Sequence, residues 1–331
     1  MVLNKNIKNF INYFLGPALF VWLAWSIYKQ IKSQQHLKES WDHIKASFNS
    51  LNIVYLLTAI LLIPVNWGLE AFKWKRSVSF IYPISYIQSF KAVLSGVSFS
   101  VTMPNRVGEY FGRMIYMPEG QRLRTISATM VGGFAQLLVT ILMGTAGLLI
   151  LKAPLMKSFN SSVIWYQFII YGLTALVFIL ILLYFNIAGS VGLFKNRIRK
   201  EKYIYLVEAL RNFNKSVLMQ LLVLSLIRYS VFVLQYILIF YLFDVSLSWG
   251  ILASVMSVVF LAMAIIPSIA LLEVGLRGEI SIKLIGLFSV NTLGVSLTSV
   301  TVWVMNLILP AVIGSLLILN LHVFKSRNED I

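Results

Sequence analysis

The sequence predicts an all-α polytopic membrane protein with about six full spans and two oppositely oriented re-entrant helical hairpins, which together form an inverted repeat. Hydrophobic residues make up 59% of the 331 residues and charged residues only 12%, whereas soluble domains carry about 25% charged residues. Several apolar stretches are long enough to cross a bilayer as helices. Two further apolar segments are interrupted by proline, glycine and charged residues, as in broken membrane helices.

The first half of the chain begins with an expected span at 11–31. In residues 33–50 apolar side chains recur every three or four positions, which predicts an amphipathic helix at the membrane interface. Residues 51–151 are expected to form the first repeat. Its re-entrant hairpin is predicted at 84–117, where the chain is apolar, then broken by proline, and then continues as a short helix.

A further span is expected at 162–185, followed by a basic cytoplasmic connection at 186–215. The second repeat is expected at 216–321, with its re-entrant hairpin at 247–290. All of these segments belong to one transmembrane domain that covers residues 1–331. The two hairpins start from opposite sides of the membrane in this scheme, which is the pattern of an inverted repeat.

The net charge of +16 comes from cations that cluster between the apolar stretches. This distribution follows the positive-inside rule and favours a membrane over nucleic acid as the partner. It predicts a multi-pass protein of the cell (inner) membrane with both termini in the cytoplasm. At the end of the span near residues 51–72, Glu70 and Lys73 are interpreted as a helix-end ion pair beside the interfacial Trp67 and Trp74.

The sequence offers little for catalysis or metal binding. It has no cysteine, and its three histidines lie in polar flanks: His36, His43 and His322. A zinc site needs three or four converging ligands, so we expect no metal and no cofactor. No nucleotide-binding motif with the spacing Gly-x4-Gly-Lys-Ser/Thr is present, so we expect no ATP-driven step. The chain is not expected to be an enzyme, and no catalytic residue is assigned.

Proline, glycine and charged residues interrupt the apolar sequence at 101–113, and a similar stretch follows Pro267. Ionisable side chains at bilayer depth usually mark a pathway or a binding site. Guanidinium groups can bind phosphate oxygens bidentately. The expected substrate-binding residues come from these two stretches and from the middle of the span expected at about 216–243: Asn105, Arg106, Glu109, Arg113, Arg228, Glu273, Arg277 and Glu279.

Two less specific interpretations stay open. Glu109 and Arg113 stand four residues apart and could only neutralise each other within the hairpin. Arg228 could be a paired structural residue. The two charged stretches also correspond loosely: Pro104, Gly108, Glu109 and Arg113 have rough counterparts in Pro267, Gly275, Arg277 and Glu279.

The stretch Thr102-Met103-Pro104-Asn105-Arg106-Val107-Gly108-Glu109 resembles the Pro-x-Arg-x-Gly-Glu signature of the lysylphosphatidylglycerol synthase transmembrane, or flippase-like, family. The Trp67 to Arg76 stretch is similar to that family's Arg/Lys-Trp-Arg ending of an early span. Pro267 through Glu279 resembles a later element of the family, although Gly278 here separates Arg277 from Glu279. The resemblance covers roughly residues 10 to 320.

The resemblance implies an integral membrane module that moves an anionic or prenyl-linked (glyco)lipid between leaflets. Its expected partners are membrane lipids with an anionic headgroup or a prenyl phosphate. The soluble aminoacyl-transferase domain of two-part family members is not expected in this sequence. Two alternatives remain: a membrane-embedded lipid transferase with Glu109 or Glu279 as the base, and an accessory subunit that works with a lipid-modifying enzyme.

Overall fold

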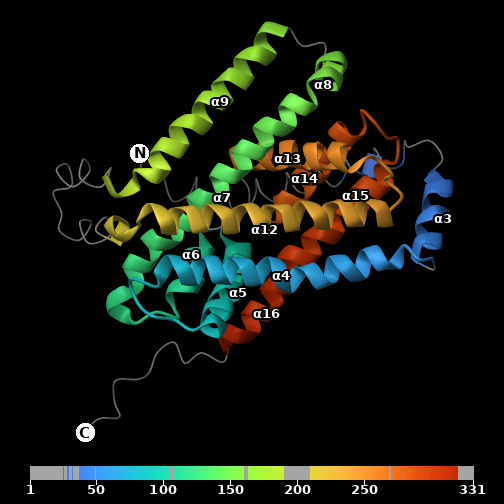
Figure 1. Ribbon diagram of the computed structural model, residues 1–331. Helices are drawn as coiled ribbons and strands as arrows, with labels where there is room; N and C mark the ends of the chain where they lie inside the picture. Colours follow the sequence, from blue (N-terminus) through green and yellow to red (C-terminus); the bar gives the residue numbers. More distant parts are fainter. Residues whose placement is uncertain are drawn as a thin grey trace, which may run out of the picture.

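The computed structural model describes residues 25, 28–29, 32, 37–48, 50–103, 107–159, 163–189, 209–267 and 270–319. Within these ranges the chain forms helices and their connections, and no strand. The predicted all-α class is therefore confirmed. Figure 1 shows the helices gathered into one bundle, with α4 and α12 running side by side along it.

Among the described residues, five helices are long and apolar enough to cross a membrane, which confirms a polytopic membrane protein. One coincides with the span predicted at 162–185 and the other four fall within the two predicted repeats, whereas most of the expected span at 11–31 lies outside the described residues. The five are α4 (Ile53–Val78), α7 (Arg122–Ile150) with the short η3 (Glu119–Gln121) before it, α9 (Val163–Phe185), α12 (Lys215–Leu242), and the continuous run of α15 (Thr292–Trp303), η5 (Val304–Ile308) and α16 (Leu309–Leu319).

The first interrupted segment is a helical hairpin of α5 (Tyr86–Thr102) and α6 (Gly108–Met114). The Ser85 side chain caps α5 by accepting the Gln88 N–H at 3.2 Å, and the Gln88 side chain accepts the Ser85 N–H in return. The two helices touch through glycines. A Cβ atom on Gly112 would lie 2.5 Å from the Cα atom of Gly96, so only glycine allows this close approach.

The second interrupted segment contains α13 (Trp249–Ile265) and α14 (Ala270–Ile285). Here the charged residues that follow Pro267 lie within α14, which is described from Ala270 onward. They therefore form part of the second helix of the segment and do not interrupt it. Glu273 and Arg277 are four residues apart on α14, as Glu109 and Arg113 are on α6. These two pairs are better counterparts than the match of Glu109 with Arg277. The opposite orientation of the two hairpins in a membrane stays a prediction.

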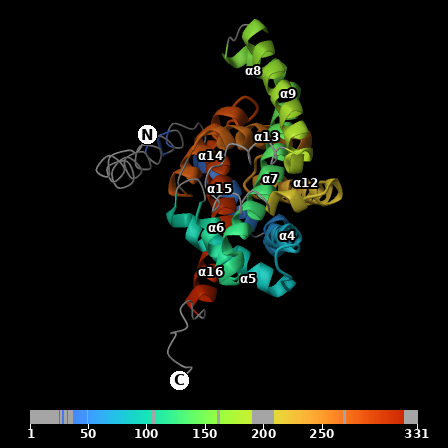
Figure 2. The ribbon, with the colours of Figure 1, turned by 90° about the vertical axis from the view of Figure 1, so that its left-hand side faces the viewer.

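The remaining helices lie at the edges of the bundle. Figure 1 shows α3 (Leu37–Phe48) across one end of α4 and α12, where Ile44 packs into the core. Figures 1 and 2 both show α8 (Lys152–Phe159) and the adjoining end of α9 projecting beyond the other helices. The short η4 (Ala209–Asn212) precedes α12, whose first turn is capped by the Asn214 side chain.

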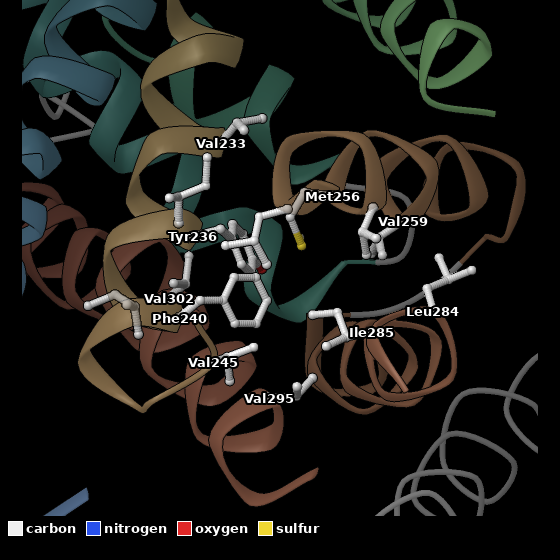
Figure 3. Close-up of a cluster of buried hydrophobic side chains, with 14 of the residues drawn as sticks. Val233, Tyr236, Phe240, Val245, Met256, Val259, Leu284, Ile285, Val295 and Val302 are labelled. Atoms are coloured by element: carbon white, nitrogen blue, oxygen red, sulfur yellow. The ribbon is translucent and has the colours of Figure 1, made fainter. Parts of the chain in front are cut away.

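Two clusters of buried hydrophobic side chains hold the described part of the chain together. The first joins α12, α13, α14 and α15; Figure 3 shows its centre around Tyr236, Phe240 and Met256. The second joins α5 and α16 with the end of α4 and the start of α7, around Trp74 and Leu138. Helices α4, α7 and α12 contribute to both clusters, and they carry polar side chains where one cluster gives way to the other.

The close contact of α5 and α6 generates a stability prediction. Gly112→Ala adds a methyl group that must push the two helices apart, so we expect it to destabilise the protein by about 1–3 kcal/mol. Gly172→Ala is the matched control, because a Cβ there meets nothing within 4 Å. Thermal unfolding in detergent should show a lower Tm for the first variant and no loss for the second. An unchanged Tm in Gly112→Ala would contradict the packing.

Candidate functional site

The most densely charged part of the bundle interior is centred on the carboxylate of Glu70 in α4. Its oxygens lie 2.7 Å from Lys73 Nζ, 3.0 Å from Arg113 Nη2 and 3.4 Å from Arg228 Nη1. These partners come from α4 itself, from the hairpin helix α6 and from α12. One carboxylate therefore connects three elements that are far apart in the sequence.

Two more residues complete this group, which we call the Glu70 cluster (Glu70, Lys73, Glu109, Arg113, Gln136 and Arg228). The Glu109 carboxylate accepts a 2.9 Å hydrogen bond from the same Arg113 nitrogen that contacts Glu70. On α7, the Gln136 amide oxygen accepts hydrogen bonds from Lys73 and Arg228, each at 3.4 Å. These are weak bonds by length, so the lysine and the arginine are held loosely on that side.

The Glu70 cluster is buried near the middle of the spanning helices. The side chains of Lys73, Arg113 and Glu70 are 3%, 4% and 8% exposed. Gln136 and Arg228 stand halfway along α7 and α12. Charges taken out of water are tolerated only when they are paired and hydrogen-bonded. The close pairing around Glu70 meets that requirement, and it also holds several cations together in the interior.

A cavity of about 250 Å³ opens against the Glu70 cluster, and we call it the charged cavity. All six cluster residues line it. The rest of the lining combines hydroxyl-bearing and aromatic residues with one glycine and one leucine: Trp67, Tyr110, Thr129, Gly133, Leu137 and Thr140. The cavity thus presents cations and hydrogen-bonding groups within the apolar bundle, which is the chemistry that binds an anion.

A second buried ion pair lies on α14. Arg277 is paired with Glu273 and donates a 3.1 Å hydrogen bond to the hydroxyl of Tyr236 on α12. The guanidinium also lies 5.7 Å from the ring centre of Phe232 and 5.8 Å from that of Phe260, within the range of a cation–π interaction. The hairpin helix α14 is therefore fixed to α12 and α13 by charge as well as by apolar packing.

The second ion pair borders another cavity of about 240 Å³, which we call the aromatic cavity. Aromatic rings and amide side chains line it, together with both arginines of the region: Asn66, Trp67, Gln136, Thr140, Arg228, Tyr229, Phe232, Phe260, Met263, Ala264, Glu273, Arg277, Val302, Trp303, Asn306 and Leu307. Four of these residues also line the charged cavity: Trp67, Gln136, Thr140 and Arg228. The two cavities are therefore neighbours, and Arg228 belongs to both.

The structure brings together five of the eight residues that the sequence singled out for binding. Of these, Glu109, Arg113 and Arg228 line the charged cavity, and Glu273, Arg277 and again Arg228 line the aromatic cavity. Asn105 and Arg106 lie outside the described residues. Glu279 lines neither cavity and is paired with the exposed Lys283 at 3.3 Å.

Sequence reasoning assigned no binding role to Glu70, Lys73, Gln136, Asn66 or Asn306, although all five line these cavities. The ion pair expected between Glu70 and Lys73 is present, but it is buried and does not sit at an exposed helix end. A signal was available for the amides, since Gln136 and Asn306 interrupt otherwise apolar spans. Polar side chains in such positions are costly unless other groups meet them.

The arrangement can bind and orient an anion, but it has few groups for chemistry. Among the described residues, no group of three or more histidines, cysteines, aspartates or glutamates could hold a metal ion. The carboxylates of the two cavities are all ion-paired with lysine or arginine. A carboxylate in that state is a weak general base.

Fold and site together define a polytopic membrane protein with paired charges and cavities inside its helical bundle. The chain belongs to the family described as "Lysylphosphatidylglycerol synthase TM region", whose family model matches residues 13–278. This confirms the family that the sequence motifs suggested. No curated protein matches the chain.

The burial of the Glu70 cluster generates a second prediction. Glu70→Gln leaves Lys73, Arg113 and Arg228 close together without their shared carboxylate, so we expect a loss of about 3–5 kcal/mol in the free energy of unfolding. Lys283→Gln is the control, because Lys283 is 64% exposed and surface pairs contribute only about 0–1 kcal/mol. Thermal unfolding in detergent measures both. The double variant Glu70→Gln/Lys73→Met should recover part of the loss, and an unchanged Tm in Glu70→Gln would refute the pairing.

Proposed function

We propose that this protein is a flippase-like transporter that moves an anionic or prenyl-linked lipid between the leaflets of the membrane. The observation that carries the proposal is the Glu70 cluster: buried cations lining a cavity halfway through the bundle. Ionisable groups at that depth are expensive and usually mark a substrate pathway. Membership of a family named for a lipid-modifying synthase supports a lipid as the substrate.

The charges of the site favour an anion as the transported group. Among the described residues that line the two cavities, four carry a positive charge: Lys73, Arg113, Arg228 and Arg277. Three carry a negative charge: Glu70, Glu109 and Glu273. One positive charge is left over, and Arg228 is the most loosely held of the cations, at 3.4 Å from Glu70. A phosphodiester carries one negative charge and would complete the balance.

In this proposal the carboxylates keep the cations in place until the lipid arrives. The headgroup phosphate then takes over the free hydrogen-bonding capacity of Arg228 and Arg113, while the acyl chains stay in the hydrocarbon. Pairing with Glu70 and Glu109 limits the cost of burying these arginines in the empty site. We further propose that the protein lies in the cell membrane with both termini in the cytoplasm, and that transport is passive or coupled to an ion gradient.

The alternative functions have less support. A lipid transferase would need Glu109 or Glu279 as a base, but Glu109 is paired with Arg113 and Glu279 lies away from both cavities. An accessory subunit that works beside a lipid-modifying enzyme would not need charges inside the membrane. Variants without those charges should therefore lose transport but keep an accessory role, so they distinguish the two functions.

Reconstitution into liposomes tests the proposal. The vesicles contain a trace of phosphatidylglycerol with a fluorescent acyl chain, and dithionite added outside bleaches only the outer leaflet. Vesicles that hold the protein should lose nearly all fluorescence, whereas protein-free vesicles should keep the inner-leaflet fraction. Arg113→Gln and Arg228→Gln should each slow the loss at least about tenfold, because each removes a charge-assisted contact of about 1.5–3 kcal/mol.

Lys152→Gln is the matched control, since Lys152 is an exposed cation at the start of α8 and lines neither cavity. It should move lipid at the wild-type rate. Each variant is first shown to elute as a folded monodisperse protein. Equal rates for wild type, Arg113→Gln and Arg228→Gln would contradict transport through these cavities, and product formation from an added activated donor would favour the transferase.

A further inference from the structure

Another cavity lies at the end of the bundle where α4 ends and where α7 and α12 begin. Its volume is about 270 Å³, and we call it the basic pocket. The lining residues come from the chain just after α4, from the first turn of α7, and from η4: Phe80, Ile81, Arg124, Ala209, Arg211 and Asn212. Figure 1 shows these helix ends together on the left of the bundle. Among the described residues, none lines both this pocket and the charged or aromatic cavity.

The walls of the basic pocket are held in place by contacts within the protein. The ring of Phe80 meets the ring of Phe213 edge to face, with the ring centres 4.9 Å apart, which fixes η4 to the end of α4. Ala209 and Phe213 are 3% and 2% exposed, so η4 is packed at its start and directly after its end. The Asn214 side chain accepts the Val217 N–H at 2.8 Å and caps α12. The pocket is therefore preformed, and little free energy is lost in ordering it around a ligand.

The polar part of the lining favours an anion. It consists of two arginines, Arg124 and Arg211, and of Asn212, whose amide can donate hydrogen bonds. None of the described lining residues is acidic. Arg211 and Asn212 are exposed, so a ligand can reach them from the surface of the bundle.

Two guanidinium groups match a phosphate better than a carboxylate. Each guanidinium presents a planar fork of N–H donors that can bind two oxygens at once. A carboxylate has only two oxygens, so a single fork occupies both. A terminal phosphate has three, and it leaves an oxygen for the second arginine and for the amide of Asn212. The donors of the basic pocket are therefore those that a terminal phosphate requires.

The position of the pocket favours a lipid as the source of this phosphate. Helices α4, α7 and α12 are long and apolar enough to span, so their common end lies at the edge of the hydrocarbon. The half-buried Phe80 and Ile81 supply an apolar wall, and the exposed Tyr82 that follows is typical of a membrane interface. Basic pockets between spanning helices bind anionic headgroups. The positive-inside rule explains cations at this end, but it does not require a cavity between them.

We propose that the basic pocket binds the terminal phosphate of an anionic lipid in the leaflet at this end of the bundle. The site is separate from the proposed transport route, because Arg124 lies twelve residues before Gln136 on α7, about 18 Å along the helix axis. A lipid bound here joins the end of α4 to the start of α7 and to η4, and it stays in its own leaflet. The inference does not depend on whether the protein moves lipid.

A local probe tests the pocket. The chain has no cysteine, so the variant Asn212→Cys places a single thiol in the lining, and its rate of reaction with a water-soluble thiol reagent is measured on the full chain in detergent. Saturating dihexanoyl phosphatidic acid should slow the reaction at least about tenfold. Dihexanoyl phosphatidylcholine has the same chains but no terminal phosphate, so it controls for partitioning into the micelle and should protect little. Glycerol 3-phosphate has the terminal phosphate without chains, and half protection should need at least about tenfold more of it.

The arginines are then removed one at a time from the Asn212→Cys protein. Arg124→Gln and Arg211→Gln should each raise the phosphatidic acid concentration for half protection at least about tenfold, because each removes a charge-assisted contact. Lys215→Gln is the matched control, since Lys215 is an exposed cation at the start of α12 that does not line the pocket. It should change that concentration by less than about threefold. Each variant is first shown to elute as a folded monodisperse protein.

Each outcome decides the proposal. Protection by phosphatidic acid that both arginine variants weaken would sustain it. Equal protection by glycerol 3-phosphate and phosphatidic acid at the same concentration would sustain a phosphate site and overturn a lipid as its source. Equal protection by phosphatidylcholine, no protection by any ligand, or an unchanged half-protection concentration in either arginine variant would overturn the site itself. The readout is the reaction of one thiol, so a failure of lipid movement in liposomes would refute the proposed function and leave this inference standing.

Discussion

The interior of this protein depends on one carboxylate. Glu70 joins α4 to the hairpin helix α6 through Arg113 and to α12 through Arg228, and it neutralises Lys73 on its own helix. Without it, three cations would face one another in an apolar bundle, where charge repulsion is screened poorly. The position of the hairpin and the charge of the cavity beside it therefore follow from the same contact.

The location of the two cavities follows from the division of the buried apolar residues into two clusters. One hydrophobic cluster packs α12 to α15, and the other packs α5 and α16 against the ends of α4 and α7. Polar residues gather where the clusters meet, and both cavities open there. The last spanning helix changes from one cluster to the other at its π-helical turn, so α15 packs on α14 while α16 packs on α5. A bundle built this way holds its charged groups between two apolar bodies.

Much of the fold could be predicted from the sequence because bilayer thickness sets the length of an apolar helix. The same rule located Arg228 as a charge within a span. Glu70 was misinterpreted because it lies near tryptophans and a basic cluster, which is typical of a helix end. In fact α4 continues to Val78, so Glu70 lies deeper than an end at residue 72 would place it. Its contact with Arg228 joins distant parts of the chain, and no local pattern reveals such a contact.

The charged residues of α14 show a second limit of prediction from the sequence. When the stretch after Pro267 is treated as an interruption, Arg277 and Glu279 look equivalent. In the observed helix they are two residues apart, about 200° around the axis, so only Arg277 shares a face with Glu273. Side-chain direction in this region depends on where the helix begins, and α14 is described from Ala270 onward.

The central claim is that the paired charges surround a hollow that water and a lipid headgroup can enter. The chain has no cysteine, so a single cysteine can be placed at Thr140, which lines both cavities and lies one turn beyond Gln136 on α7. In liposomes, this cysteine should react with a negatively charged, water-soluble thiol reagent, and phosphatidylglycerol added at increasing fractions should slow the reaction. A cysteine at the neighbouring buried Leu138 should stay unreactive. Failure of the Thr140 position to react, or a rate that lipid does not change, would contradict the account.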